Sequence, residues 1–331
     1  MKPSTASPTA SRKSALLCAA AGLLLGLLAA CSLFIGKYPL SLGGLLTGDP
    51  SQLRVFWTLR FSRTVTGVFG GFCLGAAGFV YQTVLRNPLA SPDVVGVSSG
   101  ASAGAAAGIL FFSGAGAVTL CAFGGALTAA AVVLGLSGLD RTGKGGSIVL
   151  AGIAVHALAQ TALMCLKLTA DPERQLASIE YWIMGSLNGI SLHAIGGNLA
   201  LCLVCLAALF LLHRQLLLLS VEESEARMLG ARVGRLRLTV ILTATLAVSS
   251  VVSLTGLVSF VGLLAPHGAR LLTGHNKCST MWLSGLLGGV LLCGADILAR
   301  IGAIELPVSI FTSLLGAPFL IYLIVKEGRR A

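Results

Sequence analysis

Apolar residues follow one another in long runs along this chain, and polar residues are confined to the short stretches between the runs. A helix needs about 20 mostly apolar residues to cross the hydrocarbon core of a bilayer. On that length we predict about ten membrane-spanning helices, some short enough to be strongly tilted. The predicted segments are 15–35, 65–85, 94–112, 114–136, 146–168, 193–212, 238–254, 258–272, 281–298 and 309–325.

The composition agrees with a membrane location. The 331 residues are 55% hydrophobic and only 11% charged, whereas soluble domains carry about 25% charged residues. Soluble enzymes and disordered chains are therefore excluded. Most of the 42 glycines lie within the apolar runs, where small residues allow close helix packing. The fold class is accordingly all-α, a polytopic membrane protein.

The net charge of +11 reflects Lys and Arg clusters between the apolar runs. Such clusters determine topology, so we expect no nucleic-acid partner. With the N-terminus inside and an even number of spans, both termini are cytoplasmic, and basic residues favour the predicted cytoplasmic segments about two to one. The first run follows basic residues as in a signal peptide, but its length favours a span. We divide the chain into a cytoplasmic tail, 1–14, and one transmembrane domain, 15–331.

The nine cysteines show no recurrent metal-ligand spacing. Cys202 and Cys205 form a C-x-x-C pair, but the pair lies in the middle of an apolar run, where a thiol behaves as a small hydrophobic group. We predict no metal site and no resident cofactor.

Two loops differ from the others. Residues 170–189 are polar and include Tyr181 and Trp182, aromatic types that anchor proteins at a membrane interface. Residues 214–237 form the most charged stretch, in which acidic residues precede Gly230, a pattern that predicts a short helix ending at a glycine. This stretch is either a solvated loop or a docking element for a cytoplasmic partner.

Three Pro- and Gly-containing stretches, at 87–101, 256–270 and 305–318, interrupt the helical pattern. Non-helical backbone at membrane depth is tolerated only where protein or a water-filled cavity covers it. In the first stretch, Pro92 and Asp93 are expected to begin the next helix.

Taken in order, these motifs resemble the FecCD-type family, the permeases of bacterial ABC importers for iron-siderophores, haem and cobalamin. The matching elements are Leu59–Arg63 (LRFSR), Asn87–Ala101 (NPLASPDVVGVSSGA), Leu150–Ala154 (LAGIA), Trp182–Ser186 (WIMGS), Ala226–Gly230 (ARMLG), Gly256–Arg270 and Ala295–Pro318. The resemblance covers nearly everything after the N-terminal tail.

The resemblance implies a fold like that of the type II, cobalamin-permease importers, and a transport function without catalysis. The implied partners are cytoplasmic ATP-binding subunits, which bind the ATP, an extracytoplasmic substrate-binding protein, membrane lipid, and a second permease copy in a homodimer or a heterodimer. The implied location is the bacterial inner membrane. An iron-siderophore is the first expected substrate, before haem and cobalamin.

The resemblance also implies roles for particular residues. The coupling site for the ATP-binding subunit would comprise Glu222, Glu223, Glu225, Ala226, Arg227, Leu229 and Gly230. The outer arginines Arg60, Arg63 and Arg300 would pair with glutamates of the binding protein; alternatively, Arg60 and Arg63 only extend their side chains to the interface. The translocation path would include Asn87, Pro88, Ser98, Ser99, His156 and Gln160.

Some of these residues allow a structural role instead. A lone membrane histidine such as His156 is often satisfied by a neighbouring helix. His267 is expected to stabilise a helix terminus, and Asp296 to pair with Arg300, four residues later on one helical face.

Parts of the sequence suggest two other functions, a serine hydrolase and a secondary transporter. Gly96–Gly100 matches G-x-S-x-G, but a hydrolase elbow needs a strand before the serine, and none is predicted. A proton-driven secondary transporter is the main alternative, yet nearly all acidic residues lie in loops or at the ends of spans, away from relay positions. The chain has no G-x-x-x-x-G-K-[ST] loop, so an ATPase would be a separate polypeptide.

Overall fold

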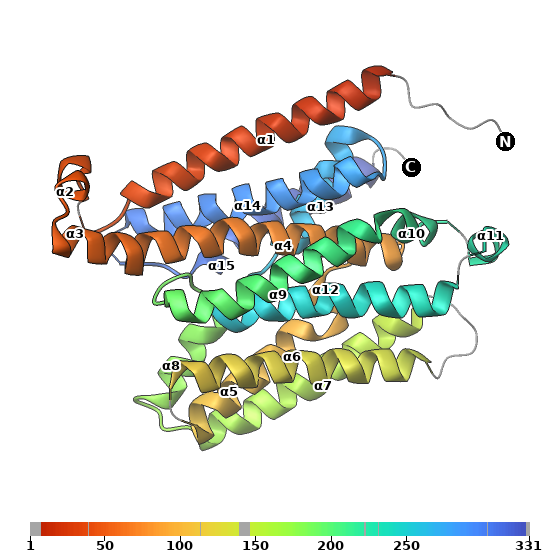
Figure 1. The fold of residues 1–331 in the computed structure, drawn as a ribbon. Coiled ribbons are helices and arrows are strands. Elements are labelled where there is room, and N and C mark those ends of the chain that lie inside the picture. Colours follow the sequence, from red (N-terminus) through yellow and green to blue (C-terminus); the bar gives the residue numbers. More distant parts are fainter. Residues whose placement is uncertain are drawn as a thin grey trace.

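The computed structural model describes residues 8–38, 40–112, 114–138, 146–221, 223–230, 232–302 and 304–328, and every regular element within them is a helix. The elements are α1 (Pro8–Phe34), α2 (Leu42–Leu46), α3 (Pro50–Val55), the π-helical turn η1 (Phe56–Phe61), α4 (Ser62–Val84), the 3₁₀ turn η2 (Pro92–Val95), α5 (Val97–Phe111), α6 (Ala115–Gly138), α7 (Gly146–Thr169), α8 (Gln175–Ile183), α9 (Leu192–Leu211), α10 (His213–Leu218), α11 (Glu223–Met228), α12 (Val233–Thr255), α13 (Val261–Thr273), α14 (Cys278–Ile301) and α15 (Val308–Gly328). The long helices lie side by side in one bundle (Figure 1).

Each predicted apolar segment coincides with a helix of this bundle, which confirms the all-α membrane fold. Among the described residues, seven helices are long and apolar enough to cross a membrane. Two shorter apolar helices, Val97–Phe111 and Val308–Tyr322, accompany them. The predicted count of ten spans is not confirmed.

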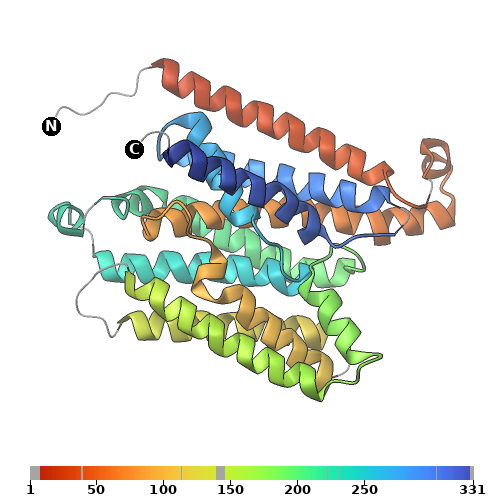
Figure 2. The same cartoon turned by 180° about the vertical axis from the view of Figure 1, so that it is seen from behind.

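The bundle has two distinct ends. The beginning of α1, the end of α15, and the short helices α10 and α11 lie at one end, hereafter the α11 end (Figures 1 and 2). Helices α2, α3 and α8 lie at the opposite end, hereafter the α8 end. The described chain thus begins and ends on the same side of the bundle, as an even number of crossings requires. Helix α1 begins at Pro8, within the predicted tail.

Helices α4, α12 and α14 form the centre of the bundle. In its most apolar window, α4 is 78% buried, whereas α1 is only 17% buried. The Tyr81 hydroxyl of α4 hydrogen-bonds the Thr245 hydroxyl of α12 at 2.7 Å, so a buried polar pair connects the two central helices.

Small residues bring the central helices into backbone contact. A Cβ atom on Gly71 of α4 would lie 2.5 Å from the Gly288 carbonyl oxygen of α14, and one on Gly75 would overlap the backbone of Ser284. A Cβ on Gly104 of α5 would overlap the backbone of Cys121 in α6 in the same way. At these positions glycine permits the close helix contact that the sequence predicts.

The predicted breaks in the helical pattern are present and meet inside the protein. After α4, Ala90 and Ser91 are buried, η2 follows, and Gly96 adopts a left-handed conformation (φ 75°) before α5 begins. Between α12 and α13, Phe260 also has a positive φ of 67°. The two breaks share one small cavity, lined by residues of both, among them Pro92 and Phe260. Protein therefore covers this irregular backbone, as the membrane interior requires.

Candidate functional site

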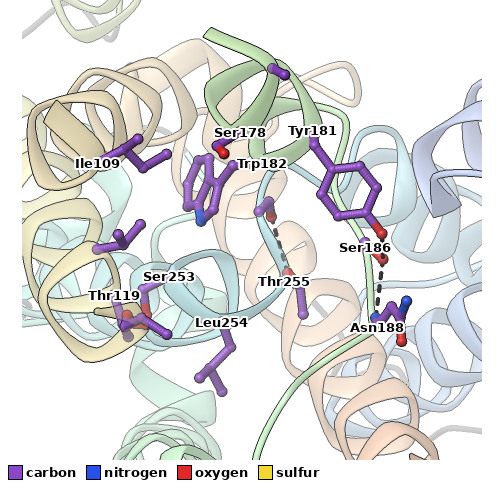
Figure 3. Close-up of a pocket in the computed structure, with 14 residues that line it drawn as sticks. Ile109, Thr119, Ser178, Tyr181, Trp182, Ser186, Asn188, Ser253, Leu254 and Thr255 are labelled. Atoms are coloured by element: carbon purple, nitrogen blue, oxygen red, sulfur yellow. Dashed lines mark hydrogen bonds between the residues drawn. The ribbon is translucent and has the colours of Figure 1, made fainter. Parts of the chain in front are cut away.

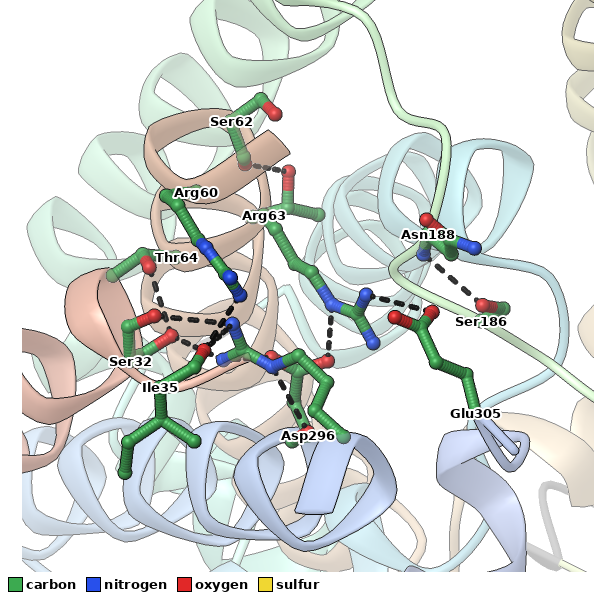
Figure 4. A network of polar contacts seen from close by, with 12 residues as sticks. Ser32, Ile35, Arg60, Ser62, Arg63, Thr64, Ser186, Asn188, Asp296 and Glu305 are labelled. Atoms are coloured by element: carbon green, nitrogen blue, oxygen red, sulfur yellow. Dashed lines mark hydrogen bonds and ion pairs between the residues drawn. The ribbon is translucent and has the colours of Figure 1, made fainter. Parts of the chain in front are cut away.

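Arg63 lies at the centre of a buried ion network at the α8 end. Its Nε is 2.7 Å from Asp296 Oδ1 of α14, and its Nη1 is 3.2 Å from Glu305 Oε2, in the segment before α15 (Figure 4). Arg300 Nη2 approaches the other Asp296 oxygen at 2.7 Å. The predicted Asp296–Arg300 pair is therefore confirmed, and one carboxylate accepts from two guanidinium groups.

The same network holds the end of α1. Arg60 donates from Nη1 to the Ile35 carbonyl at 2.6 Å and from Nη2 to the Tyr38 carbonyl at 3.0 Å. Arg300 donates from Nη1 to the carbonyls of Ser32 and Ile35 at 3.0 and 3.1 Å. Carbonyls in the last turn of a helix, such as that of Ser32, have no partner within the helix, and cations there satisfy them while opposing the helix dipole. The carbonyls of Ile35 and Tyr38 belong to the segment that follows α1.

These contacts change the expectation for the three arginines. Arg60, Arg63 and Arg300 are only 4%, 5% and 2% exposed. The premise that they are exposed charges is therefore wrong for this conformation, and so is the alternative that Arg60 and Arg63 merely extend to the interface. Intramolecular carboxylates and carbonyls accept hydrogen bonds from all three guanidinium groups, which sequence spacing did not reveal. Docking of a binding protein at this end stays a prediction.

A π-helical turn, η1, places two of these arginines. Residues Pro50–Val84 form one continuous helical stretch of 35 residues, and η1 lies within it, before Arg63. The stretch begins at the Asp49 cap of α3, where the carboxylate accepts from the Ser51 amide at 2.9 Å and from the Ser51 hydroxyl at 2.7 Å. These hydrogen bonds lower the pKa of Asp49, which lies outside the spans. No signal in the apolar pattern indicated the π turn.

The residues predicted for a translocation path fall into two groups. Asn87 and Pro88 are exposed in the loop after α4, where Asn87 Oδ1 accepts from the Leu89 amide at 2.9 Å. This is a turn-stabilising contact. His156 is exposed and Gln160 is partly exposed on α7.

Ser98 and Ser99, by contrast, are buried at the beginning of α5. The Ser98 hydroxyl donates to Asp93 Oδ1, and the Ser99 hydroxyl donates to the Gly96 carbonyl at 3.0 Å. Because η2 packs against α7, Asp93 also interacts electrostatically with His156. The structure thus brings Ser98 and His156 to one carboxylate, but not Asn87 or Pro88. That the six residues line a path stays a prediction.

The short helix predicted within 214–237 is present as α11. It projects from the bundle (Figure 1), and Gly230 follows it in a left-handed conformation (φ 82°). Ala226 is buried, whereas Leu229 is 67% exposed. Glu223 Oε2 is 3.5 Å from Arg237 Nη2, which ties α11 to α12.

The other predicted coupling residues are less informative. Glu225 is exposed, and its carbonyl accepts from the Leu229 amide at 3.1 Å. Arg227 belongs to α11, and Glu222 lies outside the described residues. Exposed apolar side chains at the end of a short projecting helix, Met228 and Leu229, have the form of a protein-docking element, which a solvated loop does not need.

A cavity at the α8 end was not predicted. It has a volume of about 500 Å³ and lies between α6, α8 and the end of α12 (Figure 3). Trp182 and Tyr181 line it, with Ser186 accepting from the Tyr181 hydroxyl at 3.2 Å. Among its described lining residues there is no Asp, Glu, Lys or Arg, so this surface suits uncharged groups. The W-x-MGS motif and the aromatic pair were the signals that pointed to this loop.

Backbone contacts fix α8 against α12 beside that cavity. The Ser186 amide donates to the Thr255 carbonyl at 2.7 Å. A Cβ on Gly256 would overlap the Trp182 carbonyl, and one on Gly185 would overlap the Leu257 carbonyl. Glycine at these two crossing points is what lets the segments meet.

The described residues contain no group of three or more His, Cys, Asp or Glu side chains able to hold a metal ion. Cys202 and Cys205 are buried free thiols on α9. The expected absence of a metal site and of a cofactor stays a prediction.

A bundle of long apolar helices, with irregular backbone enclosed at its centre and a short helix projecting at one end, defines a multi-pass membrane protein. Comparison with known families gives a sharper assignment. The chain belongs to the FecCD transport family, whose model matches residues 23–326. This family comprises permease components of ABC transporters.

Characterised relatives align over most of the chain. The chain is 36% identical over 286 residues to the cobalamin import system permease protein BtuC of Halobacterium salinarum, which covers 86% of this chain and 77% of the relative. It is 33% identical to the Fe(3+)-citrate import system permease protein YfmE of Bacillus subtilis, over 93% of this chain and 94% of the relative. It is 35% identical to the ferric enterobactin transport system permease protein FepD of Escherichia coli, over 93% of this chain and 94% of the relative.

A solved structure supports the same fold. A transporter assigned to the metal-chelate type of ABC transporter, in an inward-facing conformation, superimposes with a TM-score of 0.85 at 32% identity. The alignment covers 93% of this chain and 98% of that one.

Proposed function

We propose that this chain is the permease subunit of an ATP-driven importer that moves an iron-siderophore complex across the bacterial inner membrane. The observation that supports ATP as the energy source is α11, a short helix that projects from the bundle and is joined to α12 by the Glu223–Arg237 pair. The exposed side chain of Leu229 follows directly after this helix. Such a helix would transmit a nucleotide-driven movement of a bound subunit to the spans as a rigid-body change. The ATP is bound by that separate subunit.

The orientation follows from the same element. Because a cytoplasmic ATP-binding subunit would dock on α11, the α11 end is the cytoplasmic end, and both termini are cytoplasmic. A substrate-binding protein would then dock at the α8 end. The predominance of basic residues in the predicted cytoplasmic segments supports this orientation.

A second permease copy would complete the path. Two helices carry large apolar side chains that are exposed in the single chain and that a second copy could cover. They are Leu150, Ile153 and Leu158 on α7, and Leu314 and Leu315 on α15. A two-fold dimer formed through these faces would place the path between the chains. A homodimer is the simpler assembly, and a heterodimer with a related permease is the alternative.

The substrate class rests on the relatives. Ferric citrate and ferric enterobactin are named for two of the relatives described above, and cobalamin for the third. Iron-siderophore therefore comes first, before cobalamin and haem. The chief alternative, a proton-driven secondary transporter, gains no support from Asp296, whose carboxylate is occupied by two arginines.

The test is reconstitution of the permease in vesicles with its ATP-binding subunit and binding protein, measuring uptake of radioactive ferric siderophore and ATP hydrolysis. The proposal is supported if uptake requires ATP. It also predicts that Leu229→Asp abolishes both this uptake and the co-purification of the ATP-binding subunit. Leu46→Asp is the matched control for subunit co-purification, since Leu46 is an exposed leucine of α2 at the opposite end of the bundle. Uptake driven by a proton gradient without ATP would contradict it.

Uptake of labelled haem and cobalamin is measured in the same vesicles with their own binding proteins. Faster uptake of either than of the ferric siderophore would overturn the substrate assignment while leaving the ATP-driven mechanism in place.

A further inference from the structure

A second large cavity lies at the α11 end, between α10 and the first turns of α12. Its volume is about 480 Å³, within the range of small-molecule sites. The walls include Leu212 and Leu218 from the α10 region and Leu236 from α12, and the polar lining includes Arg232 and Arg235. The cavity therefore combines apolar walls with two positive charges.

Both guanidinium groups are available to a ligand. Arg232 and Arg235 are exposed. Within the part of the chain that the structure describes, neither side chain forms an ion pair or a hydrogen bond, whereas their neighbour Arg237 is paired with Glu223. Two adjacent, unneutralised arginines attract an anion, and their planar donors suit phosphate oxygens.

The depth of the cavity matches the membrane surface. The candidate spans of α9 and α12 are Ala194–Leu211 and Val233–Thr255. Arg232 and Arg235 thus flank the beginning of the α12 span, and Leu212 follows the last residue of the α9 span. The ends of membrane spans lie near the level of the lipid headgroups. Helix α11 projects from the bundle beyond these span ends (Figure 1).

An exposed apolar surface continues from the cavity along the two spans. Leu211 of α9 is 83% exposed, and Leu238 and Leu242 of α12 are 46% and 38% exposed. Acyl chains would cover such a surface, so the apolar and basic parts together fit one amphipathic molecule.

We propose that this cavity binds the headgroup of an anionic phospholipid of the cytoplasmic leaflet, with Arg232 and Arg235 on the phosphate and the acyl chains along α9 and α12. Basic pockets beside cytoplasmic span ends have the charge and position to bind such headgroups. The assignment of the leaflet rests on the proposed orientation. A lipid here would contact Leu229 and Gly230, which also line the cavity, and would therefore stabilise the base of the docking helix.

The experiment uses the full-length chain purified in detergent, without any ATP-binding subunit or substrate. The protein is mixed with equal amounts of phosphatidylglycerol and phosphatidylcholine carrying identical acyl chains, and bound lipids are counted by native mass spectrometry. The variants are R232Q/R235Q, the charge-conserving R232K/R235K, and the control R12Q/K13Q. The control removes two exposed basic residues at the same end of the bundle but outside the cavity.

We expect the wild type to retain phosphatidylglycerol preferentially. Since each basic residue near a membrane surface contributes a several-fold preference, R232Q/R235Q should lower that preference about tenfold or more, with R232K/R235K between the two. R12Q/K13Q should behave as wild type. If R232Q/R235Q does not elute as a folded protein, R235Q alone replaces it, with about a fivefold loss expected.

Three outcomes would overturn the proposal. One is an unchanged lipid preference in the glutamine variants, and another is an equal loss in R12Q/K13Q, which would indicate general charge attraction. The third is displacement of the lipid by millimolar inorganic phosphate, which would indicate a site for free anions. Because transport is not measured, failure here leaves the proposed transport function standing, and failure of that function leaves lipid binding measurable.

Discussion

Arg63 of α4 and Asp296 of α14 form a buried ion pair with an N–O distance of 2.7 Å, although 232 residues separate them in the chain. The same carboxylate receives Arg300 at 2.7 Å. Removing one partner of a buried ion pair leaves an uncompensated charge in a poorly solvated place.

Asp296→Asn should therefore destabilise the protein strongly, by about 3–5 kcal/mol, because two guanidinium groups lose their shared carboxylate. Glu305→Gln is the matched control. Among the described residues, Glu305 forms an ion pair with Arg63 alone, and its side chain is 26% exposed, so solvent replaces part of the lost interaction and the effect should be at most about 1 kcal/mol. Thermal unfolding in detergent measures both. Equal shifts in melting temperature would show that the network is not centred on Asp296.

The contact between α4 and α14 gives a second prediction. Gly75→Ala should destabilise the protein by about 1–3 kcal/mol, because the new methyl group would overlap the backbone of Ser284 and the helices would have to separate. Gly26→Ala in α1 introduces the same methyl group where nothing lies within 4 Å. The control should be neutral or slightly stabilising, since alanine favours a helix by up to about 1 kcal/mol over glycine.

Both variants are compared by melting temperature and by the yield of monodisperse protein. A Gly26→Ala effect as large as that of Gly75→Ala would mean that glycine flexibility, rather than helix contact, determines the result.

How far the sequence predicts this architecture differs between its parts. The lengths of the apolar runs located the bundle helices. A helix such as α6 or α9 must be apolar over its whole length to lie in lipid, whichever helices it packs against. These lengths could not indicate η1 or α8, whose conformations depend on tertiary contacts such as the Ser186–Thr255 hydrogen bond.

The arginines show the limit most clearly. Arg60 and Arg63 precede an apolar run, a position equally compatible with exposed and buried side chains. Their burial depends on carbonyls near Ile35 and on Asp296, which the fold alone brings to them. The partner of Arg300 was predictable because it lies four residues away on the same helix face. Local pairs were thus accessible from the sequence, whereas long-range ones were not.

Substitutions of Gly230 test whether the left-handed backbone after α11 is needed for coupling, without introducing a steric clash. The φ of 82° at Gly230 favours glycine, yet no atom lies within 4 Å of a Cβ built there. Gly230→Ala should then reduce coupling through backbone strain of about 1 kcal/mol, whereas Gly230→Asn should retain more activity because asparagine tolerates the left-handed region. ATP hydrolysis stimulated by the loaded binding protein, in the reconstituted complex, is the measurement. If both variants match wild type, the left-handed turn is not needed for coupling.

The adjacent serines of α5 separate a structural role from a transport role. Ser98 donates to the Asp93 carboxylate, whereas Ser99 donates to the neutral Gly96 carbonyl at 3.0 Å, and both side chains are buried. Hydrogen bonds to charged groups contribute about 1.5–3 kcal/mol against about 0.5–1.5 kcal/mol for neutral ones. Ser98→Ala should accordingly lower the melting temperature more than Ser99→Ala, while substrate uptake per folded molecule changes little in either variant. His156→Ala, at an exposed position on α7, should show the converse: a small change in stability and a clear change in uptake if α7 lines the path. Uptake that falls with Ser98→Ala at unchanged stability would instead place the Ser98 hydroxyl on the substrate route, and would require this segment to open during transport.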